Sequence, residues 1–294
     1  MRKVYSVQNG VRKIKTTIDH FRVASALVAT GLITAVALPF AANAAPTPTT
    51  IVVTPTNTQG WTTADTRPGG AVNYVVDATA PGNPHAGALQ LTTDNTTVAK
   101  AQYMHDTNTS LSSVTELSYV TKQNSANFPG GDPSYQLATC LGGVSGTTCT
   151  GFTTFVYEPY ENGTVTPGVW QTWDVAAGQV WSSRTYTDGA TCSVAAGAGG
   201  APFYTLADLQ ANCPNAVVVG FGVNVGSNNP SYDVEADLVD FNGTTYNFEP
   251  FAAVTDKDAC KKDGWKAQFD ANGNGFKNQG DCVSYVASGG KSQR

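Results

Sequence analysis

The stretch YDVEADLVDFNGTTYNF, residues 232–248, decides the fold. Two runs rich in β-branched and aromatic residues, 232–241 and 244–248, are separated by Asn242 and Gly243. Both of these residues tolerate the positive φ angles that the two-residue turns of β-hairpins require. The stretch therefore predicts two antiparallel strands that are joined by a tight turn.

Similar strand-like runs, separated by Gly, Pro, Asn or Asp, recur along most of the chain. They cover residues 71–77, 87–93, 97–104, 113–121, 133–140, 151–158, 169–175, 178–183 and 216–224. Short strands with turn residues between them are typical of an antiparallel β-sandwich or barrel. One helix is predicted over residues 204–213, where Thr205 and Asp208 form a variant of the capping box. We therefore expect an all-β antiparallel sandwich with one short helix.

The N-terminal 44 residues have the features of an export signal. Six basic residues and one acidic residue precede the apolar run VASALVATGLITAVALPF, and an A-x-A motif ends at Ala44. The apolar run is nearly long enough for a permanent membrane anchor, but the small residues before Ala45 favour cleavage. We therefore expect a signal peptide over residues 1–44, a Pro/Thr spacer over 45–50, and a secreted or cell-surface protein with no remaining membrane span.

Charge is distributed unevenly over the remaining chain. The whole chain has 17 basic and 22 acidic side chains, so removal of the leader leaves 11 and 21, a net charge of −10. Residues 45–253 contain 16 acidic residues but only four basic ones, which excludes nucleic acid as a partner because phosphates require cations. Residues 254–294 carry a net charge of +2, which suggests docking on anionic envelope polymers. The residues that motivate this docking hypothesis are Lys257, Lys261, Lys262, Lys266 and Lys277.

All six cysteines follow the leader, and an even number in an exported protein indicates disulfides. Fifteen pairings are formally open. Pairing of nearest neighbours is the simplest geometrically and predicts Cys140–Cys149, Cys192–Cys213 and Cys260–Cys282. The last bridge would close a C-terminal hairpin motif over residues 254–294, after a sandwich domain over residues 51–253.

Several sequence segments, taken together, resemble known proteins. They are GWTTADTRPGGAVNYVVDATAP, VWQTWDV, PNAVVVGFGVNVGS and DLVDFNGTTYNFEP, within residues 51–250. As a set they resemble a family of exported bacterial β-sandwich proteins that are lectin-like in layout and mostly of unassigned function. The resemblance implies a jelly roll like that of concanavalin or a carbohydrate module, but no activity. The ending CKKDGWKAQF…FKNQGDCVSYV resembles a short motif of unassigned role that ends many exported bacterial proteins.

An aromatic cluster suggests a glycan as the partner, since sugar C–H faces stack on aromatic rings while polar neighbours bind the hydroxyls. Strand alternation places Trp170 and Trp173 on opposite faces, so one is expected in the core and the other could be exposed. Large aromatic residues in sandwiches also serve as packing. The predicted ligand-binding residues are Tyr157, Glu158, Tyr160, Trp170, Trp173, Asp174 and Trp181.

Two other functions remain open from the sequence. One is a structural or adhesive surface protein without a small ligand. The other is a retaining glycosidase, because Glu235, Asp237 and Asp240 approach the E-x-D-x-x-E pattern of laminarinase-type enzymes. That resemblance would make them nucleophile, orienting residue and acid/base respectively, with a shorter Asp at the last position and a bulge needed to align it. The simpler interpretation is an outward acidic face.

Residues 269–282, FDANGNGFKNQGDC, match part of a calcium loop. Asp270, Asn272 and Asn274 alternate before Gly275, and Asp281 takes the twelfth position, where a Glu is preferred. The run CVSYV that follows is β-branched and too short to predict the exit helix of an EF-hand. The sequence therefore favours a polar turn in a disulfide-closed hairpin. We expect no resident cofactor, with structural calcium here, or at Asp237 or Asp240 with loop carbonyls, as the alternative.

Overall fold

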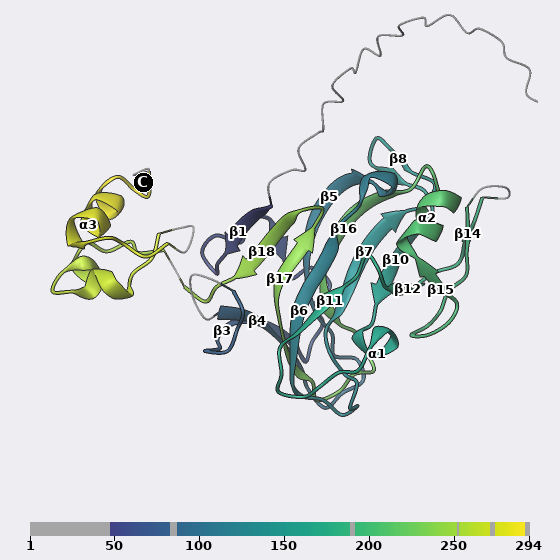
Figure 1. Ribbon diagram of the computed structural model, residues 1–294, viewed down its shortest axis with the longest axis horizontal. Helices are drawn as coiled ribbons and strands as arrows, with labels where there is room; N and C mark the ends of the chain where they lie inside the picture. The colour runs from purple at the N-terminus through teal and green to yellow at the C-terminus, as the bar shows by residue number, and fades with distance from the viewer. Residues whose placement is uncertain (1–47, 83–86, 189–191, 252, 271–273, 292–294) are drawn as a thin grey trace, which may run out of the picture. The chain divides into compact units, whose positions relative to one another are not determined.

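The computed structural model describes residues 48–82, 87–188, 192–251, 253–270 and 274–291, so the predicted signal peptide lies outside the described residues. Two seven-stranded sheets form a β-sandwich (Figure 1), as the sequence predicts. Within the described residues, no helix has the length and apolar character needed to cross a membrane.

The first sheet is organised around one long strand, β17 (Asp233–Phe241). Along one edge β17 pairs with β6; along the other it pairs first with β4 and then with β18. Strand β1 pairs with β18 in parallel, whereas all the other strand pairs of the two sheets are antiparallel. The other strands of this sheet are β1 (Thr49–Val53), β3 (Gly70–Val76), β4 (Gly87–Thr93), β6 (Leu117–Ser125), β11 (Gln171–Asp174) and β18 (Thr244–Phe248).

The second sheet has the strand order β15-β12-β10-β7-β16-β5-β2. Its strands are β15 (Phe203–Thr205), β12 (Gln179–Ser182), β10 (Phe152–Tyr157), β7 (Ser134–Cys140), β16 (Val217–Val225), β5 (Ala101–Ser110) and β2 (Trp61–Thr62). Two small hairpins, β8 (Val144–Ser145) with β9 (Thr148–Cys149) and β13 (Tyr186–Thr187) with β14 (Ser193–Val194), complete the strands. The short helices are α1 (Pro159–Asn162) and α2 (Leu206–Asn212).

Trp61 joins the two sheets at the centre of the core. The residue is only 2% exposed, and its ring lies 5.3 Å from Tyr103 and 5.5 Å from Phe221, both in its own sheet. From the opposite sheet, Tyr246 and Phe248 approach it to 5.3 and 5.0 Å. These separations are typical of favourable aromatic pairs, so one indole fills the space between the layers.

Several local predictions are confirmed. Asn242 and Gly243 have φ angles of 58° and 82° in the turn between β17 and β18. The Thr205 hydroxyl accepts a hydrogen bond from the Asp208 N–H, and the Asp208 carboxylate accepts one from Thr205 N–H, so α2 begins with a complete capping box. The structure contains the three disulfides Cys140–Cys149, Cys192–Cys213 and Cys260–Cys282.

Two strand starts were predicted four residues too early, because β5 begins at Ala101 and β6 at Leu117. Before β5, the Asp94 carboxylate accepts hydrogen bonds from the N–H and hydroxyl of Thr96, which holds a turn. Before β6, a 3₁₀ turn covers Leu111–Ser113. Side chains that bond locally to the backbone compete with the sheet, and β-branched Val98 extended the apparent strand into the first turn.

The prediction of a C-terminal hairpin is wrong, because residues Gln279–Ala287 form helix α3. Asn278 caps its first turn by accepting a hydrogen bond of 2.9 Å from the Asp281 N–H. Cys282 and Tyr285 then lie on one face, three residues apart, and are buried in a small core with Cys260. Capping, helical spacing of the buried residues and the disulfide together outweigh the β propensity of CVSYV. Two 3₁₀ turns, Asp258–Cys260 and Gly264–Ala267, complete the motif.

Replacement of Trp61 by Ala should lower the free energy of unfolding by about 3–5 kcal/mol, since it leaves a large cavity between the sheets. Urea unfolding followed by circular dichroism measures this loss. Val98→Ala is the control, because Val98 is 64% exposed and its change should stay within about 0.5 kcal/mol. Equal stability of the two variants would contradict the central role of Trp61.

Candidate functional site

A groove of about 1050 Å³ lies on the outer face of the second sheet. Strand alternation positions its lining: Val156, Gln136 and Asn224 point into the groove, whereas their neighbours Tyr157 and Val223 are buried in the core. Side chains from five adjacent strands line one cavity, so this face of the sheet is concave. The lining along these strands comprises Trp181, Thr154, Val156, Ser134, Gln136, Ala138, Asn224, Gln102 and Met104, with Ser183 and Glu158 directly after β12 and β10.

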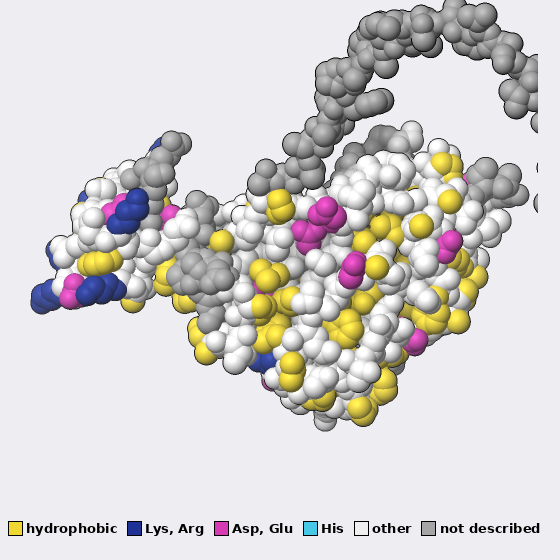
Figure 2. All heavy atoms as spheres, in the orientation of Figure 1, with side chains coloured by type: hydrophobic (Ala, Val, Ile, Leu, Met, Phe, Trp, Pro, Cys, Tyr) yellow, Lys and Arg dark blue, Asp and Glu magenta, His cyan; other side chains and the backbone are white. Residues whose placement is uncertain are grey.

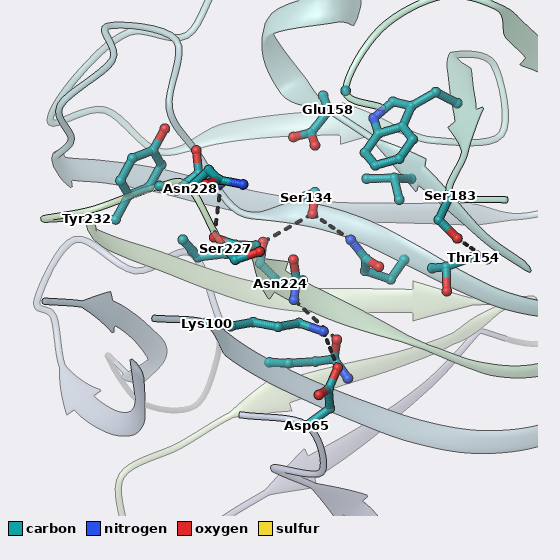
Figure 3. Close-up of a pocket in the computed structure, with 18 of the residues that line it drawn as sticks. Asp65, Lys100, Ser134, Thr154, Glu158, Ser183, Asn224, Ser227, Asn228 and Tyr232 are labelled. Carbon is teal, nitrogen blue, oxygen red and sulfur yellow. Dashed lines mark hydrogen bonds and ion pairs between the residues drawn. The ribbon is translucent and has the colours of Figure 1, made fainter. Parts of the chain in front are cut away.

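A row of hydrogen-bonded polar side chains crosses the groove floor. Gln136 Nε2 donates to Ser134 Oγ at 2.8 Å, and Ser134 Oγ donates to the Asn224 carbonyl at 3.1 Å. Asn224 Nδ2 continues the row to Gln102 Oε1 at 3.2 Å. Figure 3 shows Glu158, Ser134, Asn224 and Lys100 in succession across the strands. Because these amides and hydroxyls are held by one another, their orientation is set before a ligand arrives.

Aromatic side chains stand at the groove walls. Trp181 is half-buried in the lining. Tyr160, at the start of α1, meets Phe128 edge-on at 5.3 Å, and Phe128 is 45% exposed. Phe152 is 38% exposed in the same lining. The groove therefore offers aromatic surface beside fixed polar groups.

Two carboxyl groups in the groove have strongly raised pKa values. Burial raises the pKa of Glu158 to about 8, although hydrogen bonding with the Trp181 side chain lowers it. Burial raises the pKa of Asp132 to about 7, although a hydrogen bond from the Thr121 hydroxyl lowers it. Asp132 Oδ1 is buried and has no hydrogen-bond partner. At neutral pH a large fraction of both groups is therefore uncharged.

Most of the basic side chains of the sandwich lie at the groove. Of the four basic side chains in residues 45–253, three line it: Arg67, Lys100 and Arg184. Asp65 forms ion pairs with Lys100 and, at 3.6 Å, with Arg67. The exposed guanidinium of Arg184 lies 5.2 Å from the centre of the Phe152 ring. In the view of Figure 2, by contrast, Lys and Arg gather on the C-terminal motif, while Asp and Glu are scattered over the sandwich.

The structure brings three of the predicted ligand residues, Glu158, Tyr160 and Trp181, into the groove. Tyr157 and Trp173 are buried in the core at 2% and 7% exposure, as strand alternation predicts for one tryptophan of the 169–175 run. Trp173 Nε1 donates to the Thr121 hydroxyl at 2.7 Å.

The remaining two predicted ligand residues lie at the first sheet, Asp174 at the end of β11 and Trp170 directly before it. Trp170 donates to Asp77 Oδ2 at 3.1 Å, and the Lys122 ammonium lies 5.4 Å from its ring centre. Asp174 accepts a hydrogen bond from the Ala177 N–H. The predicted cluster is therefore divided between the groove, the core and the first sheet.

Sequence reasoning missed Gln136, Asn224, Asp132 and the basic groove residues. The available signal was alternation, since Ser134 and Gln136 are polar between the aromatic and apolar residues Tyr135 and Leu137. That pattern predicts a polar face on one strand, but it does not predict that the outer faces of five strands lie side by side.

The carboxylates of the glycosidase hypothesis have separate partners, and none of them lines the groove. Glu235 accepts from Asn124 at 2.7 Å and pairs with Lys122 at 3.2 Å. Asp237 is fully buried, and Asp240 accepts from the Gly243 N–H and the Thr245 hydroxyl in the turn. The bulge that the hypothesis requires is present between Asp237 and Asp240.

The carboxylates of the calcium-like loop accept hydrogen bonds from nearby backbone N–H groups. Asp270 Oδ1 accepts from the Asn274 N–H at 2.8 Å, and Asp281 accepts from the Lys277 N–H at 3.0 Å. Asn272 lies outside the described residues. Among the residues that the structure describes, no group of three or more His, Cys, Asp or Glu side chains could hold a metal ion.

Comparison with known proteins gives no assignment. The sequence matches no protein-family model and no curated protein. Two solved structures that resemble the chain are a family 11 carbohydrate-binding module from Clostridium thermocellum in complex with a β-1,3-1,4-mixed-linked tetrasaccharide, and the same family's module of its cellulosomal cellulase Lic26A-Cel5E. Their identities are 15% and 13%, both TM-scores are 0.34, and the matches cover 64% and 65% of this chain and 91% and 89% of theirs.

The raised pKa of Glu158 predicts a pH-dependent stability. In the unfolded chain a Glu titrates near about 4.3, so between that pH and about 8 the folded state binds more protons. Stability contributed by this group therefore falls as pH rises through this window. Glu158→Gln should unfold at a higher urea concentration than wild type at pH 9, a gain on the order of 1–2 kcal/mol.

The matched control is Glu161→Gln, because Glu161 is exposed in α1, three residues beyond Glu158. That variant keeps Glu158 and should therefore retain the fall in stability between pH 5 and pH 9. A wild-type stability that rises between pH 5 and pH 9 relative to Glu158→Gln would contradict the assignment.

Proposed function

We propose that the protein is a secreted or cell-surface binding protein that recognises an extracellular or cell-envelope glycan in the groove of the second sheet. The observation that carries the proposal is the position of Trp181 beside a fixed row of amides and hydroxyls. An indole face binds the C–H face of a sugar ring, while amides and hydroxyls donate to and accept from its hydroxyls. The groove volume of about 1050 Å³ is at the upper end of small-ligand pockets, which favours an oligosaccharide.

The extracellular location is supported by two features of the chain. The leader has the charge, apolar run and small residues of an export signal. The three disulfides are typical of proteins that fold in an oxidising compartment. The basic C-terminal motif would then add a weak attachment to anionic envelope polymers.

Trp181→Ala should reduce glycan binding at least about tenfold, as truncation of a central aromatic contact does in binding sites. Screening on a glycan array, followed by affinity electrophoresis with the hits, measures this. Trp170→Ala is the matched control, because Trp170 contacts Asp77 and Lys122 outside the groove. Equal binding of both variants, or retention on intact cells without binding to any glycan, would favour a structural or adhesive protein instead.

The charges of the groove favour a glycan that carries carboxylate or sulfate groups. Arg184 is exposed at the groove, while a large fraction of the carboxyls of Glu158 and Asp132 there is uncharged near neutral pH. Arg184→Ala should weaken binding of a uronate-containing oligosaccharide several-fold and leave a neutral one unchanged. The control is Lys291→Ala, which lies outside the groove lining and is not one of the five docking lysines. Preference for the neutral ligand in wild type would contradict this charge selectivity but not glycan binding itself.

Hydrolysis is the second candidate, and the raised pKa of Glu158 favours it. A partly exposed carboxyl that keeps its proton near neutral pH is suited to act as a general acid. If the protein is a hydrolase, it should release reducing ends from a bound glycan, and Glu158→Gln should abolish release while retaining binding. Absence of release from every glycan that binds would leave binding as the function.

A further inference from the structure

One residue from each of five adjacent strands forms a straight row across the floor of the groove. The strands are β12, β10, β7, β16 and β5, in the order in which they pair. The row consists of Trp181, Val156, Gln136, Gly222 and Met104, each the register partner of the next. All except Gly222 line the groove, and the Met104 side chain lies over that glycine, where a Cβ atom would be 2.9 Å from its Sδ. A row of register partners crosses the strands at nearly a right angle.

A second row of register partners runs parallel to the first and is polar. It consists of Ser134, Asn224 and Gln102, on β7, β16 and β5. Each lies two residues along its strand from the first row, a distance of about 7 Å. On the other side of the first row, the partners Ala138 and Gly220 present almost no side chain. Over β7 and β16, the fixed amides and hydroxyls of the second row therefore stand on one side only.

Loop residues stand at one end of the strands, so a long ligand fits along the rows better than along a strand. The loop that follows β16 contributes Ser227 and Asn228 to the groove lining, and Tyr232 stands beside them (Figure 3). Next to β12, by contrast, the lining is formed by the small residues Ala198 and Gly199. A chain that followed the strands would meet the bulkier loop residues, whereas one that followed the rows would meet small ones beside β12.

The length of the first row matches several sugars of an extended chain. Adjacent strands lie about 4.8 Å apart, so the five strands separate Trp181 from Met104 by roughly 19 Å. One pyranose ring with its linking oxygen is about 5 Å long, close to one strand spacing. The floor beneath is narrow, because Ser134, Gln136 and Asn224 are only 3%, 8% and 4% exposed. A sugar branch directed at the floor would therefore have no room.

We propose that the groove binds a linear, extended glycan of at least about four sugars, which crosses the strands from Trp181 on β12 to Met104 and Gln102 on β5. This inference rests on the proposed function and adds the class of glycan and its direction. Ring faces pack on the mostly apolar first row, and the hydroxyls along one edge of the chain bond to the second row. A short or compact glycan reaches only part of either row.

The test uses the protein without its leader and ladders of oligosaccharides from two to six sugars. The probes are β-1,4-linked oligomannuronates, which are charged, and cello-oligosaccharides, which are neutral, and both are linear and extended. Calorimetric titration should show an affinity that rises about tenfold or more from the disaccharide to the tetrasaccharide and changes little beyond the pentasaccharide. The plateau measures the length of the row, because sugars beyond its last strand add no contact.

Variants at the two ends of the row locate the chain. Met104→Ala should weaken binding of the pentasaccharide several-fold and leave the disaccharide, which binds at Trp181, unchanged. Trp181→Ala should weaken binding of both. Gln102→Ala should repeat the selective loss, so the result does not depend on the folding of one variant. Asn108→Ala is the matched control, because Asn108 is exposed on β5 and does not line the groove.

The outcomes separate this inference from the function on which it rests. Equal affinity for the disaccharide and the hexasaccharide, or an equal loss for short and long probes in Met104→Ala, would overturn the extended chain and leave glycan binding in place. The same conclusion follows if branched glycans bind on the array and no member of either ladder binds. If no glycan of any kind binds, the proposed function itself fails.

Discussion

The two-residue repeat of the second sheet is the constraint on which both the core and the groove depend. On β7, Tyr135 and Leu137 point toward the first sheet, while Ser134 and Gln136 point outward. A shift of one residue in the register of this strand would exchange these faces, burying polar side chains and exposing aromatic ones. The register is thus fixed by burial, and the positions of the groove residues follow from it.

The sequence predicted the class of fold well because the signals for it are local. A turn of two residues with positive φ, a capping box and alternating β-branched residues each act over a few positions, as the hairpin at Asn242 and Gly243 illustrates. The nearest-neighbour disulfides are local in the same sense. Helix α3 was missed because the packing of Cys282 and Tyr285 in a small core of its own outweighs the β propensity of their run.

The candidate site was only partly predictable, since it is assembled by pairing between strands that are far apart in the chain. Trp173 and Trp181 are close in sequence, yet the first packs in the core from β11 and the second faces the groove from β12. Asn224 and Gln102 meet across more than a hundred residues. A pattern of residue types predicts which face of a strand a side chain occupies, but not which strands lie beside it. Glu158 could therefore be predicted to lie close to aromatic residues, but not to line a groove.

A short chain of contacts, which begins close to Asp237, also joins the two sheets. Three residues farther along β17, the Asp240 carbonyl accepts a hydrogen bond of 2.8 Å from the buried Tyr135 hydroxyl of the second sheet. Tyr135 lies between Ser134 and Gln136, whose side chains form part of the groove floor. The position of β17 therefore restricts the backbone that positions this floor. This hydrogen bond crosses a core that contains aromatic side chains of both sheets, and it helps to hold the register of β7 on which the groove floor depends.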